Sequence, residues 1–101
     1  MTMEFLVEFE VDVPDGTSES EVRERNRAEA VAAAGLAADG HLLRLWRPTA
    51  ATGEPTAVGL YAADSQAELD GLLRALPIAE WMQVTVVPLS PHPNDPGRDV
   101  R

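Results

Sequence analysis

The amino-acid sequence predicts an α+β domain in which two helices cover one face of an antiparallel sheet. Three features indicate this fold class. Apolar and polar residues alternate along 3–13, which is typical of a strand with one buried face. Two Ser-x-x-Glu sequences, at Ser18–Glu21 and Ser65–Glu68, each open a stretch that has the apolar spacing of a helix. Turn-forming glycine and proline residues separate these segments.

The first half of the chain is expected to form a strand, a turn and a long helix. In strand 3–13 the apolar residues share one face and the acidic residues share the other, with Leu6 as the exception. Pro14-Asp15-Gly16 ends this strand as a turn. The helix then covers 19–39, with Ser18 as its N-cap and Gly40 as its C-terminal cap.

The second half is expected to add three strands and a shorter helix. The strands cover 41–47, 56–63 and 81–89, and the helix opens at Ser65 and closes at Pro77. The resulting order, βαββαβ, is the ferredoxin-like arrangement. It places both helices on one face of a four-stranded antiparallel sheet.

We expect a single domain over residues 1–90 and an extended, proline-rich tail over 91–101. The sheet face away from the helices is expected to carry Leu42, Trp46 and Trp81, or their neighbours. Such a face is too apolar to remain in contact with water, so a cavity or a partner subunit must cover it. Two such sheets packed face to face would form a dimeric α+β barrel.

Composition and charge exclude several classes of function. The 101-residue chain has a formal net charge of −9, and its eight basic residues, all arginines, are scattered. This argues against nucleic acid and against anionic membrane surfaces, both of which require clustered positive charge. Cysteine is absent, and His41 and His92 form no metal-binding pattern with acidic residues, so we expect no metal and no cofactor. No apolar run reaches transmembrane length and no basic leader precedes the first strand, which predicts a cytoplasmic protein.

Glu29 is the residue whose position most strongly indicates chemistry. At 100° per residue, one stripe of the first helix contains Val22, Asn26, Glu29, Ala33 and Leu36. A carboxylate on such a stripe is costly unless it is paired or opens into a cavity. Arg25, one turn earlier, is placed to pair with it. Glu29 is therefore either an acid/base group or a boundary residue that reaches water with Arg25 as its surface partner.

Three segments, taken in order, resemble the muconolactone Δ-isomerase family. Asp39–Arg47 is similar to the acidic-Gly…Leu-Trp-Arg strand of that family. Leu76–Val86 is similar to its Leu-Pro-Leu…Tyr-Met…Val strand, and Pro91-His92-Pro93 to its terminal His-Pro. Together with the βαββαβ order, the resemblance covers roughly residues 3–95.

The resemblance implies a cofactor-free isomerase of aromatic catabolism. Such an enzyme moves a proton and a double bond between muconolactone and an enol-lactone of 3-oxoadipate, so the expected partner is a small lactone or enol acid. The resemblance also implies a homo-oligomer, in which dimeric barrels assemble into ring-like decamers and the tails of neighbouring subunits help to close each site.

The resemblance further suggests roles for individual residues. Glu29 falls on the glutamate of the family's first helix, and Asn26 falls on its lysine, so that lysine is absent here. Proton transfer next to a carbonyl needs a base and a group that stabilises the enolate. We expect Glu29 to be the base and Arg25 to bind the substrate carboxylate or stabilise the enolate. The other expected substrate-binding residues are Asn26, Trp46, His41, Arg47 and His92.

Three functions remain open at this point. The first is an isomerase or cyclase acting on a small lactone or enol acid, in catabolism or in a biosynthetic pathway. The second is a non-catalytic small-molecule-binding barrel. The third is another barrel enzyme, oxygenase-like or dehydratase-like, that acts on a polyketide or an aromatic compound. Two departures from the family leave room for a changed substrate: the loss of the lysine at Asn26, and Thr56–Tyr61 where the family has Tyr-Ala-Asn before a serine.

Overall fold

The computed structural model describes residues 2–49 and 55–97 and has the predicted order of elements. The elements are β1 (Met3–Val11), α1 (Glu19–Ala38), β2 (Leu42–Trp46), β3 (Ala57–Ala63), α2 (Gln66–Arg74), a 3₁₀ turn η1 (Ala79–Trp81) and β4 (Met82–Leu89). The βαββαβ prediction is therefore confirmed, while η1 was not predicted. Parts of the predicted connector and of the predicted tail, 50–54 and 98–101, lie outside the described residues.

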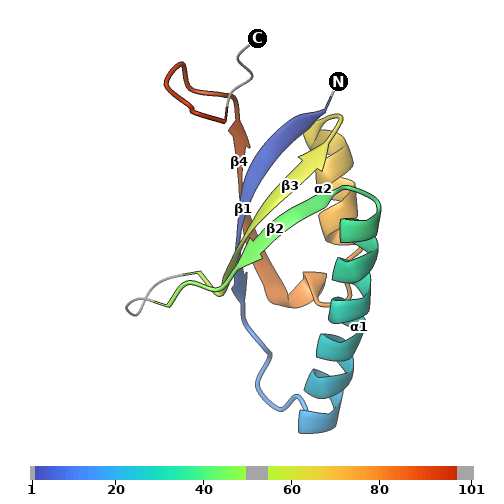
Figure 1. Ribbon diagram of the computed structural model, residues 1–101. Helices are drawn as coiled ribbons and strands as arrows, with labels where there is room; N and C mark the ends of the chain where they lie inside the picture. The colour runs from blue at the N-terminus through green and yellow to red at the C-terminus, as the bar shows by residue number, and fades with distance from the viewer. Residues whose placement is uncertain (1, 50–54, 98–101) are drawn as a thin grey trace.

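The four strands form one antiparallel sheet in the order β2-β3-β1-β4. Figure 1 shows that α1 and α2 lie on the same side of this twisted sheet and that no helix of the described residues covers the opposite side. β1 and β3 are the central strands, so they supply most of the surface on which the helices pack.

Local sequence signals fix the ends of both helices. The Oγ of Ser18 accepts a hydrogen bond from the N–H of Glu21 at 3.1 Å, and the Oγ of Ser65 accepts one from the N–H of Glu68 at 3.1 Å. Gly40 follows α1 with a φ of +83°, in the left-handed region that favours glycine. The predicted caps are thus present at these ends.

The two helices cover the sheet unequally. α2 packs tightly, with Leu69 and Leu73 buried against Phe5 and Val7 of β1. α1 has no buried residue, because its sheet-facing side carries mainly small side chains. Leu36 packs against the core, but the small side chains beside it do not fill the layer between α1 and the sheet, and the space left under α1 becomes the site described below.

The prediction for the helix-free sheet face is wrong for two of its three residues. A β-bulge between Leu42 and Arg44 shifts the alternation of β2. As a result Leu42 packs against the core on the helix side, while Trp46 stays on the helix-free face. Trp81 lies in η1 rather than in a strand, and it is buried.

The helix-free face nevertheless carries several apolar side chains, set among polar ones such as Glu4, Glu8 and Glu10 of β1. Its apolar residues, which alternate along the strands with those of the core, are Leu6, Trp46, Val58, Leu60, Val87 and Leu89. The side chains of Trp46, Val87 and Leu89 are 41%, 41% and 40% exposed. Contact of this much apolar surface with water is unfavourable, as the sequence analysis anticipated.

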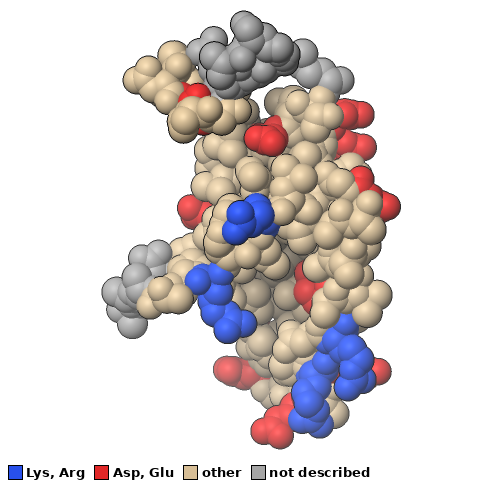
Figure 2. Space-filling view, viewed as in Figure 1, with Lys and Arg blue, Asp and Glu red and all other residues tan. Residues whose placement is uncertain are grey.

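On the face that Figure 2 shows, the basic side chains of the described residues do not form a single patch. Figure 2 shows arginines in separate groups, on the lower turns of α1 and beside β2, with acidic side chains around them. Within 2–49 and 55–97, no helix is long and apolar enough to cross a membrane.

Candidate active site

A cavity of about 600 Å³ lies between α1 and the helix-covered face of the sheet. Its walls are mainly apolar, and small residues provide the room: Ala30 and Ala33 on α1, and Ala57 on β3. The polar side chains among its described lining residues are Asn26, Glu29, Arg47, Thr56 and Tyr61. The cavity thus combines an apolar enclosure with a few polar groups, as small-molecule sites commonly do.

Glu29 lies on the face of α1 that looks toward the sheet, as its helical position predicts. Its Oε1 accepts a hydrogen bond from the backbone N–H of Ile78 at 3.3 Å. Burial raises the pKa of the Glu29 carboxyl above its usual 4.5, and the hydrogen bond from Ile78 opposes that rise with a smaller effect. A carboxylate with a raised pKa is a stronger base than one in water.

Arg25 does not pair with Glu29, so that part of the prediction is wrong. Its guanidinium Nη1 donates to the carbonyl oxygen of Pro77 at 2.8 Å and lies 2.7 Å from Oε1 of Glu80. The guanidinium carbon also lies 4.8 Å from the centre of the Trp81 ring. The segment around η1 folds back beside α1 and offers these partners together, which a position on the helix alone does not reveal.

Arg25 and Glu29 nevertheless meet at one peptide group. The carbonyl that Arg25 binds belongs to Pro77, and the N–H that Glu29 binds belongs to Ile78, so both groups are part of the same peptide bond. A cation on the carbonyl side polarises the peptide and strengthens the N–H as a donor. Arg25 is therefore placed to support Glu29 indirectly, through the Pro77–Ile78 peptide.

Two of the other expected site residues line the cavity. Asn26 lies one turn before Glu29 on α1, and Arg47 directly follows β2. Both side chains are exposed at the edge of the cavity. Arg47 brings positive charge to the wall, and Asn26 contributes a neutral amide where the resemblance places a lysine.

Three expected site residues lie outside the cavity. His41 places Nδ1 2.8 Å from the carbonyl oxygen of Ala62, an interaction that ties the start of β2 to β3. His92 accepts at Nδ1 a hydrogen bond from the N–H of Asn94 at 3.0 Å, within an exposed turn after β4. Trp46 lies on the helix-free face beneath the guanidinium of Arg44, at 5.1 Å from ring centre to carbon. Within one chain, none of the three contributes to the cavity.

Sequence reasoning missed Tyr61 and Thr56. Tyr61 is 3% exposed, and its pKa is raised to about 12, first by burial and then by the negative charge of Glu29. Thr56 Oγ1 accepts a hydrogen bond from the N–H of Val11 at 3.1 Å, which links the residue before β3 to the end of β1. The alternation of β3 was a usable signal for Tyr61, because it places this residue on the same face as Gly59 and Ala63.

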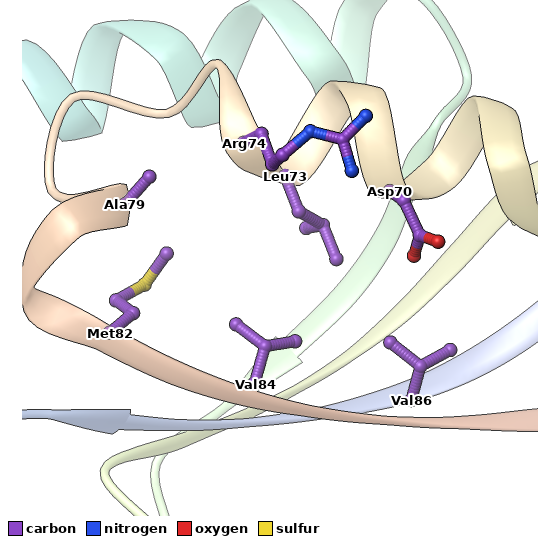
Figure 3. A pocket seen from close by; sticks show the side chains of 7 residues that line it. All are labelled: Asp70, Leu73, Arg74, Ala79, Met82, Val84 and Val86. Carbon is purple, nitrogen blue, oxygen red and sulfur yellow. The ribbon is translucent and has the colours of Figure 1, made fainter.

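A second, smaller hollow of about 260 Å³ lies between α2 and β4. Figure 3 shows that Met82, Val84 and Val86 point into it from β4, with Asp70 and Arg74 on α2 above them. Most of its lining side chains are apolar, and the charged ones are Asp70 and Arg74 on α2. This arrangement has no counterpart to the half-buried carboxylate of the larger cavity, so the larger cavity is the candidate active site. In the part of the chain that the structure describes, no group of three His, Asp or Glu side chains is arranged to hold a metal ion.

The fold and the cavity define a class of protein: a small α+β domain with a mainly apolar cavity whose lining includes a carboxylate, a phenol and an arginine. Comparison with known proteins narrows this class. The family described as muconolactone delta-isomerase matches residues 3–95, and the chain belongs to that family.

Relatives support this assignment over nearly the whole chain. Muconolactone Delta-isomerase 1 of Acinetobacter lwoffii is 30% identical over 92 residues, which cover 91% of this chain and 93% of the relative. A crystal structure of muconolactone isomerase superimposes with a TM-score of 0.84 at 25% identity, covering 98% of this chain and all (100%) of that one. The fold also matches 5-chloro-2-hydroxyhydroquinone dehydrochlorinase of Burkholderia phenoliruptrix, with a TM-score of 0.65, 18% identity and coverage of 92% and 99%.

Proposed function

We propose that the protein is a cofactor-independent isomerase that shifts a proton and a double bond in a small lactone, of the muconolactone to 3-oxoadipate enol-lactone type. The observation that carries this proposal is the half-buried carboxylate of Glu29 on the wall of a mainly apolar cavity. Membership of the muconolactone delta-isomerase family supports the choice of reaction.

Glu29 is sufficient for the proton transfers. Its carboxylate removes the proton from the ring carbon that bears the acetate arm. The C–H electron pair then moves through the ring double bond onto the lactone carbonyl oxygen. The protonated Glu29 returns its proton to the carbon next to the carbonyl, so the double bond changes place and no proton is gained or lost. One acid/base group therefore completes the reaction, provided that its pKa is near the working pH.

Arg47 is the residue best suited to hold the acetate arm. It is the cationic residue among the described lining residues, and its guanidinium presents a planar fork that matches a carboxylate. Asn26, on the same side as Glu29, supplies an amide that can orient the ring. The neutral amide in place of a lysine leaves Arg47 as the main positive charge facing the substrate.

We also infer that the active form is a homo-oligomer, at least a dimer and, by family resemblance, up to a ring of ten. The helix-free sheet face supports this inference because it exposes Trp46, Val87 and Leu89. Association of two such faces would remove that apolar surface from water.

The test compares Glu29→Gln with Glu24→Gln, the same substitution at an exposed position of α1. With muconolactone as substrate, Glu29→Gln should keep its circular dichroism spectrum and lose roughly 10²-fold or more in kcat, the usual contribution of a positioned base. Glu24→Gln should retain the wild-type rate. A Glu29→Gln protein with the wild-type rate would show that Glu29 is not the base, and a wild-type protein that leaves muconolactone unchanged would overturn the assigned substrate.

A further inference from the structure

Tyr61 is the most buried polar residue of the cavity. It is 3% exposed, whereas Glu29 is half-buried and Asn26, Arg47 and Thr56 are exposed. A donor that is buried and held in place stabilises charge better than one that must first be ordered and desolvated. The position of its hydroxyl is therefore of interest.

The Tyr61 ring leans along β3 toward the cavity. Tyr61 is paired across the sheet with Phe5, but its ring contacts Phe9, at 6.0 Å between centroids and an interplanar angle of 59°. Phe9 is paired with Ala57, which lies nearer the start of β3 by about 13 Å, at about 3.3 Å per residue. The distal end of the ring thus points toward Thr56 and Ala57, which line the cavity.

Gly59 makes this path possible. A Cβ added at Gly59 would lie 2.5 Å from Cε1 of Tyr61 and 3.3 Å from Cδ1 of Leu45. The Tyr61 ring therefore occupies the space that a side chain at position 59 would need. Phe9 lies beside the ring, so the ring is held between Phe9 and the backbone at Gly59, and Tyr61 is one of the residues that line the cavity.

We propose that the Tyr61 hydroxyl donates the hydrogen bond that stabilises the oxygen on which negative charge develops during proton transfer, and that Gly59 is the residue that positions it. This proposal rests on the proposed isomerase function. In the step concerned, Glu29 takes the proton from the ring carbon and the electron pair reaches the lactone carbonyl oxygen. Tyr61 donates to that oxygen and keeps its own proton.

The electrostatics agree with this role. In the resting site the charge of Glu29 is close enough to raise the pKa of Tyr61, together with burial, to about 12. The phenol is therefore protonated near neutral pH and available as a donor. When Glu29 accepts the proton, the negative charge leaves the carboxylate and appears on the substrate oxygen, which then becomes the acceptor that faces the phenol.

The first test is Tyr61→Phe, which removes the hydroxyl and keeps the ring over Gly59. For one lost donor to a developing oxyanion we expect kcat for muconolactone to fall roughly 10²-fold. KM should change little, because the donor acts on charge that is absent from the ground state. An unchanged kcat in a folded Tyr61→Phe protein would overturn the proposal.

A binding experiment tests Tyr61 without relying on turnover. Glu29→Gln imitates the protonated carboxyl, and 4-nitrophenolate, whose yellow colour reports ionisation, imitates the charged oxygen. Glu29→Gln should bind this phenolate at least 10-fold more tightly than Glu29→Gln/Tyr61→Phe, as expected for a hydrogen bond to a charged group. Equal binding by the two proteins, or no binding by either, would refute the role of the hydroxyl. If wild type does not isomerise muconolactone but the phenolate still distinguishes the two proteins, the proposed substrate fails and the role of Tyr61 stands.

The positioning role of Gly59 is tested by a double-mutant cycle. Gly59→Ala should displace the Tyr61 ring and lower kcat by an amount similar to Tyr61→Phe. In the Tyr61→Phe background, Gly59→Ala should cause little further loss, because the hydroxyl that it misplaces is already gone. Losses that multiply fully in the double variant would show that Gly59 has only a structural role.

Discussion

Replacing Glu29 with Gln is expected to lower the pKa of Tyr61. The pKa of this phenol is raised from 10.0 to about 12, and the larger cause is burial while the smaller is the charge of Glu29. Gln removes the charge and leaves the burial nearly unchanged. The pKa of Tyr61 should therefore fall from about 12, but by less than half of the way back to 10.0.

The sequence offers a clean assay because Tyr61 is the chain's single tyrosine. A ¹³C label at the tyrosine ring Cζ would give one resonance whose shift reports ionisation of the phenol. Titrations of wild type and of Glu29→Gln, with Glu24→Gln as the control, should give the predicted difference for Glu29→Gln alone. Identical titration curves in all three proteins would mean that Glu29 and Tyr61 do not interact, and a return to 10.0 would mean that burial is not the main cause.

Protein stability should follow the same titration. A folded pKa above the unfolded one means that the neutral phenol is favoured by folding. This contribution is fully present below pH 10, declines between pH 10 and 12, and is lost above that. At roughly 1.4 kcal/mol per pKa unit, the rise from 10.0 to about 12 corresponds to about 3 kcal/mol. Denaturant unfolding of Tyr61→Phe should lack this decline, and an equal decline in Tyr61→Phe would assign it to other groups.

Three further outcomes are expected. Burial raises the pKa of Glu29 above 4.5, so the pH profile of kcat/KM should show an acid limb whose pKa is higher than 4.5. For the same reason the ionised carboxylate destabilises the fold, and Glu29→Gln should unfold at a higher denaturant concentration than wild type at neutral pH. Arg25→Ala should lower the free energy of unfolding by about 2 kcal/mol, because the variant loses a charged hydrogen bond and a contact with an aromatic ring. It should also move the acid limb of kcat/KM to higher pH. Arg27→Ala, at an exposed position of the same helix, is the control. Leu60→Glu on the helix-free face should convert an oligomer into the 10.9 kDa chain in sedimentation, and a wild type that already sediments at 10.9 kDa would contradict the inferred association.

Local signals in the sequence were enough to predict most of the fold. The alternation in β1 and the serines at 18 and 65 act within a few residues, so their outcome depends little on the rest of the chain. The inward position of Glu29 likewise follows from helical geometry. The bulge in β2 was the exception. Strict alternation would place Leu42 and Trp46 on the same face, but one extra residue between Leu42 and Arg44 puts them on opposite faces.

The candidate site was harder to predict because its contacts join distant segments. Arg25 is held by residues 77–81, far away in the sequence, so its neighbour on the helix was the wrong partner to choose. The direction of Tyr61 depends on the missing side chain at Gly59 and on Phe9 of another strand. Neither relation has a periodic pattern in the sequence, and both became visible only when the sheet and the η1 segment were assembled.

The features that weaken the packing of this fold are the same ones that build its site. Ala30, Ala33 and Ala57 leave a cavity where larger side chains would increase apolar burial, and α1 has no buried residue as a consequence. Burial of Glu29 opposes its ionised form, yet a carboxylate in this setting is a better base than one in water. Gly59 adds no side chain to the core and thereby lets a phenol reach the same cavity. The tightly packed part of the core lies beside this cavity, where Leu69 and Leu73 of α2 pack against Phe5 and Val7.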